Sequence, residues 1–259
     1  WHVVCRENIM FKAIFFDLSG VLYDGTQVIS GAIAAVNKAQ ESHLQVRFVT
    51  NTSRMTSQQV LNGLKTMGFE LSAGQMFSAP VAAKALAQAN DWRPYCLVHK
   101  NLEAEFADID QENPNAVIIG DAEQDFCYDK LDHAFRLCQQ GAPLVGIGRN
   151  RYFKLGGKLH LDAGPFIAAL EYAASVEAII MGKPSKDFFH QVAASTRAEL
   201  SEILMIGDDI FGDIEGAIKS GMHACLVKTG KYQSGDETLI RGGFSCVDSV
   251  SAAVELALG

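Results

Sequence analysis

The segment Lys12-Ala-Ile-Phe-Phe-Asp17-Leu-Ser-Gly-Val-Leu22 decides the fold. Its first half is apolar without the polar alternation of a half-exposed strand, which is typical of a strand buried on both faces of a parallel sheet. The apolar run ends at Asp17, and a Gly-containing turn follows before the next helical pattern begins near Gly31. Asp17 is therefore too far from a helix for the N-terminal capping role that aspartate often has.

Apolar runs of strand length alternate with segments of helical period through the rest of the chain. The predicted strands are 12–16, 45–49, 95–98, 116–119, 144–147, 203–206 and 223–227, and the predicted helices are 31–41, 56–67, 82–89, 128–140, 165–174, 212–220 and 249–258. This alternation is the signature of βα units around a parallel sheet. We expect an α/β fold: a doubly wound, mostly parallel core from 10–79 and 179–259, with an inserted α/β cap domain over 80–178. Residues 1–9 are expected to be an extension outside the fold.

Composition excludes several classes of protein. Of the 259 residues, 48% are hydrophobic, and the net charge is −8, so a nucleic-acid or anionic-membrane surface is not expected. No apolar run reaches the roughly 18 residues of a transmembrane helix. The six cysteines show neither the spacing of a zinc site nor that of a disulfide framework. We expect a soluble cytoplasmic protein.

Polar residues follow three of the predicted strands at the point where each ends: Asp17, Thr50-Asn51 and Asp208-Asp209. Each residue alone has a structural alternative as a helix cap. The carboxyl ends of parallel strands meet at one edge of a sheet, however, and ligands bind there. Together these residues indicate a functional site.

Four motifs resemble those of the haloacid dehalogenase superfamily. In chain order they are Phe16-Asp17-Leu-Ser19-Gly-Val-Leu22, Val49-Thr50-Asn51, Met181-Gly-Lys183-Pro184, and Ile206-Gly-Asp208-Asp209 with Asp213. Their order and their span over most of the chain identify it as a member of the superfamily. The insert between the second and third motifs is similar to the large α/β cap of the NagD-like subgroup.

The resemblance implies a Mg²⁺-dependent phosphatase, with Asp17 as the nucleophile that accepts the phosphoryl group. Mg²⁺ would be held by Asp17, Asp208 and the backbone carbonyl of Ser19. Asp209 and Asp213 would act behind these ligands or through water, although helix capping is an equal alternative for Asp213. Residues expected to bind the substrate are Asp17, Leu18, Ser19, Thr50, Asn51 and Lys183. Lys183 would supply positive charge; its alternative is that of an ordinary surface lysine.

Ser19 departs from the family pattern. Most phosphatases of the superfamily have an aspartate there, which acts as general acid and then general base. A serine hydroxyl cannot replace it, and such help is typically worth about 10²–10⁴ in rate. One interpretation is a substrate whose leaving group needs little protonation, such as a P–N bond (phospholysine, phosphohistidine) or pyrophosphate. The alternatives are a catalytically weak regulatory module that binds phosphate and Mg²⁺, and a phosphatase of small phosphate esters.

Partners follow from the same resemblance. The expected ligand is a small phosphorylated molecule or pyrophosphate, with no nucleic acid and no membrane, and relatives often form homodimers through the cap. His99 and His160 lie in the insert and could face the substrate, but a single histidine is more often a surface residue or one whose hydrogen bonds are satisfied within the protein. No motif marks the physiological substrate.

Overall fold

A computed structural model describes residues 10–155 and 158–259. The extension expected over residues 1–9 lies outside the described part of the chain. The described residues divide into two compact units. The first consists of residues 10–49, 63–76 and 189–259, and the second of residues 50–62, 77–155 and 158–188. The first unit contains most of the predicted core, and the second contains the predicted insert. Our domain boundaries at 79/80 and 178/179 remain a proposal. Among the described residues, no helix combines the length and apolarity that crossing a bilayer requires.

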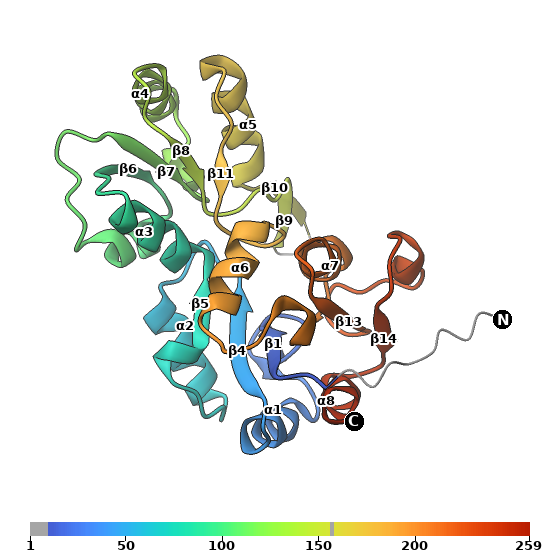
Figure 1. Ribbon diagram of the computed structural model, residues 1–259. Coiled ribbons are helices and arrows are strands. Elements are labelled where there is room, and N and C mark those ends of the chain that lie inside the picture. The colour runs from blue at the N-terminus through green and yellow to red at the C-terminus, as the bar shows by residue number, and fades with distance from the viewer. Residues whose placement is uncertain (1–9, 156–157) are drawn as a thin grey trace. The chain divides into compact units, whose positions relative to one another are not determined.

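The first unit is built on a six-stranded sheet (Figure 1). Its strand order is β14 (Ser245–Val247), β13 (His223–Val227), β12 (Ile203–Gly207), β1 (Ala13–Asp17), β4 (Gln45–Thr50) and β5 (Met76–Ser78). β1 pairs in parallel with β12 and with β4, and all five residues of β1 are buried. The chain leaves β1 toward β4 and returns to its other side as β12, so the strand order reverses at β1. A crevice outside the carboxyl ends of the strands is expected at such a point.

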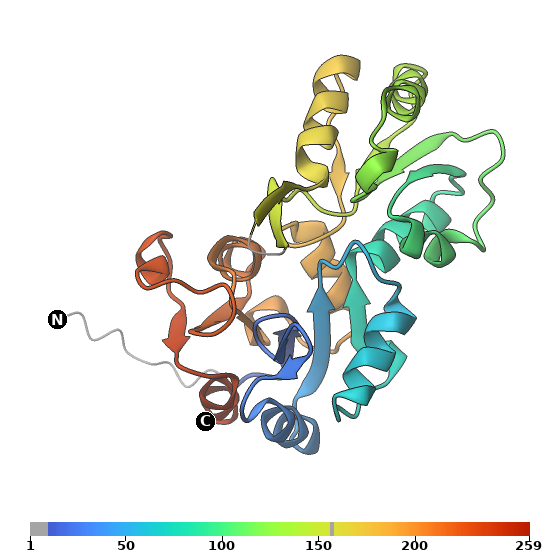
Figure 2. The same cartoon turned by 180° about the vertical axis from the view of Figure 1, so that it is seen from behind.

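Helices cover both faces of this sheet. Figures 1 and 2 show α1 (Ala32–Glu41) and α8 (Val250–Leu258) side by side on one side of β1, β12 and β13, and α7 (Gly216–Lys219) on the other. α1 and α8 bury alanines and valines and are joined at their surface by an ion pair between Lys38 and Glu255 of 2.5 Å. A π-helical turn, Ile210–Glu215, precedes α7 and packs on β12 and β13. The unit is the doubly wound α/β core that the alternation predicted.

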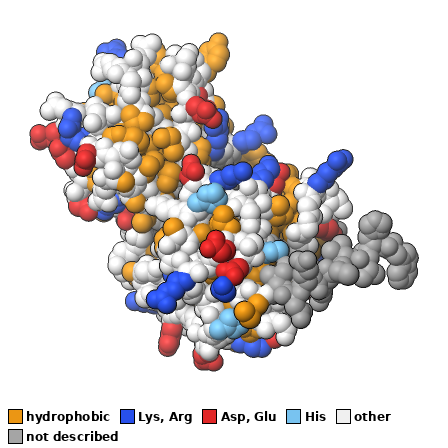
Figure 3. Space-filling view, viewed as in Figure 1, with side chains coloured by type: hydrophobic (Ala, Val, Ile, Leu, Met, Phe, Trp, Pro, Cys, Tyr) orange, Lys and Arg blue, Asp and Glu red, His pale blue; other side chains and the backbone are white. Residues whose placement is uncertain are grey.

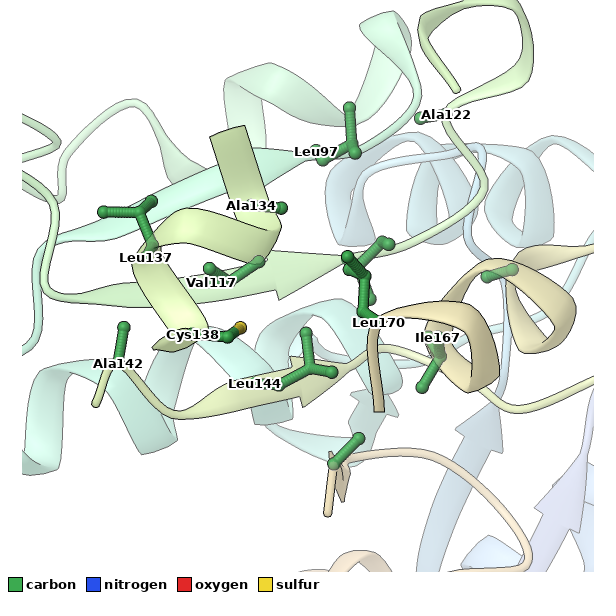
Figure 4. Packing of buried hydrophobic residues seen from close by; sticks show 13 residues of the cluster. Leu97, Val117, Ala122, Ala134, Leu137, Cys138, Ala142, Leu144, Ile167 and Leu170 are labelled. Atoms are coloured by element: carbon green, nitrogen blue, oxygen red, sulfur yellow. The ribbon is translucent and has the colours of Figure 1, made fainter. Parts of the chain in front are cut away.

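The second unit has its own parallel sheet. Its strands, in order, are β11 (Ile179–Ile180), β8 (Leu144–Gly146), β7 (Ala116–Ile119) and β6 (Pro94–Leu97), and its helices are α3 (Ala79–Ala89), α4 (Tyr128–Gln139) and α5 (Ala163–Ala174). Figure 4 shows side chains of α4 and α5, such as Leu137 and Leu170, packed against Val117 and Leu144 of the strands. Burial of these apolar faces gives the unit a hydrophobic core of its own.

Most predicted elements are confirmed with ends shifted by one or two residues, including the helix predicted over 56–67, which is α2 (Ser57–Thr66). Several short elements were not predicted: the hairpin of β2 (Tyr23–Asp24) and β3 (Gln27–Val28), the hairpin of β9 (Tyr152–Leu155) and β10 (Lys158–Leu161), β5, β14 and α6 (Lys186–Ala194). The helix predicted over 212–220 begins instead at Ile210, because the Asp209 side chain accepts hydrogen bonds from the N–H groups of Phe211 and Gly212.

Candidate active site

Three aspartates of the first unit form a buried cluster. Asp17 is the last residue of β1, Asp208 follows β12 directly, and Asp213 lies in the π-helical turn after it. One carboxylate oxygen of each lies within 4.8 Å of those of the other two. Parallel strands place Asp17 and Asp208 at the same edge, and the tight turn after β12 returns Asp213 to that edge. The sequence predicted Asp17 and Asp208 together; it left the role of Asp213 open.

Only one of the two carboxylate oxygens of Asp208 has a hydrogen-bond partner among the described residues. Its Oδ2 accepts a hydrogen bond of 2.7 Å from the backbone N–H of Lys231. Its Oδ1 is buried and has no hydrogen-bond partner among the described residues, and the residue as a whole is 1% exposed. Burial raises the pKa of Asp208 well above its usual range, and the neighbouring carboxylates of Asp17 and Asp213 raise it further. Such a group costs free energy unless a proton or a cation compensates it.

The donor set of this cluster fits Mg²⁺. The ion prefers oxygen ligands and is commonly held by one or two carboxylates together with waters and phosphate oxygens. Asp17 and Asp208 offer two buried carboxylates, and the Oδ1 of Asp208 is an oxygen that a cation would satisfy. Asp213 is a third carboxylate in this group, whereas Asp209 is occupied as the cap of the π-helical turn. Ser19, whose carbonyl the resemblance implied as a ligand, is an exposed residue in the turn after β1.

Two glycines, one in the turn after β1 and one in the loop after β13, allow the backbone to approach Asp208. Gly20 has a φ of +86°, and a Cβ atom there would lie 1.9 Å from Asp208 Oδ2. Gly230 has a φ of +60°, and its Cβ would lie 2.1 Å from the same oxygen. Backbone in this conformation favours glycine. The turn is closed by three hydrogen bonds to the Leu18 carbonyl, from the N–H groups of residues 21, 22 and 23.

The loop after β13 contributes residues that the sequence analysis did not name. The Thr229 hydroxyl donates a hydrogen bond of 2.5 Å to the Gly20 carbonyl, and the Lys231 ammonium lies 3.2 Å from Asp209 Oδ2. The signal was present, because the strand over 223–227 was predicted and its carboxyl end had to reach the same edge as Asp17 and Asp208. The polar sequence immediately after that strand, Lys228-Thr-Gly-Lys231, resembles none of the four motifs.

The remaining predicted residues, Thr50, Asn51 and Lys183, are described in the second unit. Lys183 is 5% exposed, so the alternative of an ordinary surface lysine is wrong. The Asn51 side chain donates a hydrogen bond to the Lys183 carbonyl and accepts one from the Lys183 N–H, each at 2.7 Å. Thr50 is also buried. The structure therefore brings Asn51 and Lys183 into direct contact.

The two histidines of the insert differ in their surroundings. His99 is buried in the second unit, where its Nδ1 accepts a hydrogen bond from the Asn101 N–H and its Nε2 lies 3.4 Å from Glu123. Because Nδ1 is an acceptor, the proton of the neutral ring is on Nε2 and faces the carboxylate. His99 therefore fits the alternative of a histidine whose hydrogen bonds are satisfied within the protein. His160 is an exposed residue of β10.

Comparisons with known proteins agree with these features. A profile of the haloacid dehalogenase-like hydrolases matches residues 14–112, and a second HAD-hydrolase-like profile matches residues 180–253. The phospholysine phosphohistidine inorganic pyrophosphate phosphatase of Rattus norvegicus is 38% identical over 256 residues, which cover 95% of this chain and 94% of that protein. The haloacid dehalogenase-like hydrolase domain-containing protein 2 of Bos taurus is 42% identical over 229 residues, 88% of each chain.

The fold is also shared with a solved structure. NagD from E. coli K-12 matches with a TM-score of 0.82 at 20% identity, over 93% of this chain and 98% of NagD. The two relatives are more than 30% identical to this chain, and each alignment covers most of both proteins. This similarity is sufficient to assign the chain to their family. The chain thus belongs to the haloacid dehalogenase-like hydrolase family, as a hydrolytic enzyme of its phosphatase branch.

Proposed function

We propose that the protein is a Mg²⁺-dependent phosphatase in which Asp17 becomes transiently phosphorylated. The observation that carries this proposal is the cluster of Asp17, Asp208 and Asp213, with a buried Asp208 oxygen that lacks a hydrogen-bond partner in the described part of the chain. Three carboxylates this close repel one another in the absence of a cation. Asp17 and Asp208 would hold the ion, as would the Ser19 carbonyl that the resemblance implies. Bound Mg²⁺ would neutralise charge on the transferred phosphoryl group.

The reaction would proceed in two steps through an aspartyl-phosphate. A carboxylate oxygen of Asp17 attacks phosphorus, and the bond from phosphorus to the leaving group breaks with its electron pair on that group. Water then attacks the phosphorus of the aspartyl-phosphate. The P–O bond to Asp17 breaks, the carboxylate is restored, and phosphate and a proton are released. One water molecule is consumed in each cycle.

Lys183, Thr50 and Asn51 are proposed to bind the phosphoryl group. Lys183 is a buried cationic donor, and an ammonium group forms charge-assisted hydrogen bonds with phosphate oxygens. Thr50 offers a hydroxyl and Asn51 a backbone N–H. The side chain of Asn51 is engaged with the Lys183 backbone, so it acts by positioning Lys183. Leu18 and Ser19 would contribute backbone N–H groups beside the nucleophile.

The substrate is proposed to be a phosphorylated amine, such as phospholysine or phosphohistidine, or inorganic pyrophosphate. Ser19 cannot protonate a leaving group, and these substrates need little protonation. The name of the Rattus norvegicus relative includes the same three substrates. The alternatives are a regulatory module that binds phosphate and Mg²⁺ without efficient turnover, and a phosphatase of small esters; Ser19 is the observation that favours the former.

A homodimer formed through the second unit is part of the proposal. Figure 3 shows hydrophobic side chains gathered on this unit, and its partly buried aromatic residues include Tyr95, Phe126, Phe135 and Phe166. Light scattering after size-exclusion chromatography tests the dimer. A cytoplasmic location remains a prediction; it is compatible with the five cysteines that the structure describes as free.

Released phosphate tests the catalytic proposal. Wild type should release phosphate from pyrophosphate or phosphoramidate with Mg²⁺, and Asp17→Asn should not. Acid-quenched wild type incubated with a labelled substrate should carry a phosphoryl group on Asp17. If wild type turned over neither these substrates nor phenyl phosphate, the regulatory alternative would remain. Full turnover by Asp17→Asn would show that another group is the nucleophile.

A further inference from the structure

The backbone of Lys231 is held in place beside the carboxylate cluster, whereas its ammonium group is exposed. Its backbone N–H is bound to Asp208 Oδ2 at 2.7 Å, and the loop is tied to the turn after β1 by the hydrogen bond from Thr229 to Gly20. Its side chain is nevertheless 69% exposed. The ammonium is therefore held within a side chain's length of Asp208 but remains accessible to a ligand in solvent.

The folded protein depends little on the ion pair between Lys231 and Asp209 for its stability. An exposed pair of this kind contributes about 0–1 kcal/mol. Asp209 Oδ1 already accepts hydrogen bonds from the N–H groups of Phe211 and Gly212, at 3.1 and 2.9 Å. The Asp209 side chain is also about one-third exposed, so water can replace the ammonium at Oδ2. Transfer of the Lys231 ammonium to an incoming anion is consequently inexpensive.

Charge indicates which anion the ammonium suits. Asp17, Asp208, Asp209 and Asp213 carry four negative charges if all are ionised, and a bound phosphoryl group adds further negative charge. One divalent ion and the ammonium groups of Lys183 and Lys231 offset only the four carboxylates, so the occupied site remains negative. A leaving group that carries its own negative charge would be repelled by this site unless a cation met it. An amine or imidazole leaving group carries no such charge. An exposed lysine at the rim of the cluster therefore favours substrates in which the leaving group is itself an anion.

We propose that Lys231 binds the leaving phosphate of inorganic pyrophosphate and thereby sets the preference of the site for diphosphates over phosphoramidates. This inference rests on the proposed phosphatase function. In the first step, Asp17 attacks one phosphorus, the bridging P–O bond breaks, and its electron pair remains on the bridging oxygen. Negative charge then develops on the departing phosphate, where the Lys231 ammonium stabilises it by charge-assisted hydrogen bonding. Lys231 forms no covalent bond and loses no proton.

The experiment compares three substrates in the Mg²⁺-loaded enzyme: pyrophosphate, phosphoramidate and phenyl phosphate. Lys231→Met should lower kcat/KM for pyrophosphate by about tenfold or more, as expected for loss of a charged hydrogen bond, and should lower that for phosphoramidate by less than about threefold, the scale of a rim charge. Phenyl phosphate, whose phenoxide leaving group carries a single negative charge, should lose less than pyrophosphate. Lys231→Arg, which retains the positive charge, should recover most of the pyrophosphate activity. Lys228→Met is the matched control, because Lys228 lies in the same loop but pairs with the exposed Asp248.

Three outcomes overturn the inference: an equal loss on all three substrates, no loss on pyrophosphate, or a wild type that hydrolyses phenyl phosphate but not pyrophosphate. If the wild type hydrolyses none of them, the proposed function fails, and the inference is then decided by binding. Methylenediphosphonate, a pyrophosphate analogue that cannot be cleaved at the bridge, should bind wild type with Mg²⁺ about tenfold or more tightly than Lys231→Met in calorimetry. Equal binding would also overturn the role of Lys231.

Discussion

Asn51 and Lys183 exchange two hydrogen bonds of 2.7 Å, although they are 132 positions apart in the chain. The asparagine amide uses its N–H₂ group as donor and its oxygen as acceptor, so it matches the carbonyl and the N–H of the lysine. An aspartate could only accept, and an alanine could do neither. The side chain of Asn51 therefore fixes the segment of backbone from which the Lys183 ammonium extends.

Asn51→Ala is expected to destabilise the protein and to impair it as an enzyme. Two partly buried backbone groups of Lys183 lose their partners, at a cost of about 1–3 kcal/mol. Loss of position at Lys183 should reduce kcat by about tenfold or more, because small displacements of a charge-stabilising group are costly in catalysis. Urea unfolding and steady-state kinetics measure the two effects.

Asn62→Ala is the control for this variant. Asn62 is exposed on α2 and accepts a hydrogen bond from Gln58 one turn away. Its removal should change the stability by no more than about 0.5 kcal/mol. Equal stability and equal kcat for Asn51→Ala and wild type would contradict a positioning role for Asn51.

Asp208→Asn should have opposite effects on stability with and without metal. In EDTA the variant loses one charge from a cluster of three buried carboxylates, while its amide oxygen can still accept from Lys231. The melting temperature should then rise by about 2 °C or more, since about 1 kcal/mol corresponds to 2–4 °C for a chain of this size. In millimolar Mg²⁺ the wild type should be stabilised, and the variant should show little further shift.

Differential scanning calorimetry with EDTA and with Mg²⁺ separates these effects. Asp248→Asn removes an exposed aspartate that pairs at the surface with Lys228, and it should behave as wild type in both conditions. A Mg²⁺ shift of the same size in Asp208→Asn as in wild type would place the ion elsewhere.

Gly20→Ala tests the close approach of the turn to Asp208. Gly25→Ala is a matched substitution, because Gly25 also has a positive φ, of +58°, but a Cβ atom there would meet none of the described residues within 4 Å. Both variants carry the strain of left-handed backbone, about 1–2 kcal/mol. Gly20→Ala should cost about 1–3 kcal/mol more, because its methyl group overlaps the Asp208 carboxylate. Chemical denaturation of the pair would show equal costs if the approach were unimportant.

The strands and the residues at their ends could be predicted from sequence because both are local signals. Asp17 and Asp208 each end an apolar run, and the rule that parallel strands share one edge is enough to place them together. The other expected site residues, including Lys183, were predicted from the family motifs. The sequence alone did not establish that Lys183 is buried.

The arrangement within the cluster depends on backbone geometry that no residue pattern encodes. Asp209 and Asp213 are both polar residues near the start of a helical segment, and only the π-helical turn makes one a cap and brings the other to Asp17. Lys231 was missed for a related reason. Its backbone N–H, not its side chain, contacts Asp208, and a backbone contact leaves little trace in residue type.

Ser19→Asp should convert the site toward hydrolysis of ordinary esters. Ser19 is exposed, so an aspartate can be accommodated without displacing buried atoms. A carboxyl group two residues after Asp17, the proposed nucleophile, can protonate an alkoxide leaving group and then activate water, as a serine hydroxyl cannot. The kcat for an alkyl phosphate should rise by about tenfold or more, toward the 10²–10⁴ typical of general acid–base help. Pyrophosphate hydrolysis should gain much less, because its leaving phosphate needs little protonation.

Ser19→Ala distinguishes this effect from a simple change in the turn. It removes the hydroxyl without adding an acid, so ester hydrolysis should stay at the wild-type level. The pH dependence of kcat in Ser19→Asp should also gain a limb absent from Ser19→Ala, because the new carboxyl must be protonated in the first step. If Ser19→Asp raised pyrophosphate and ester hydrolysis by the same factor, the missing acid would not explain the substrate preference.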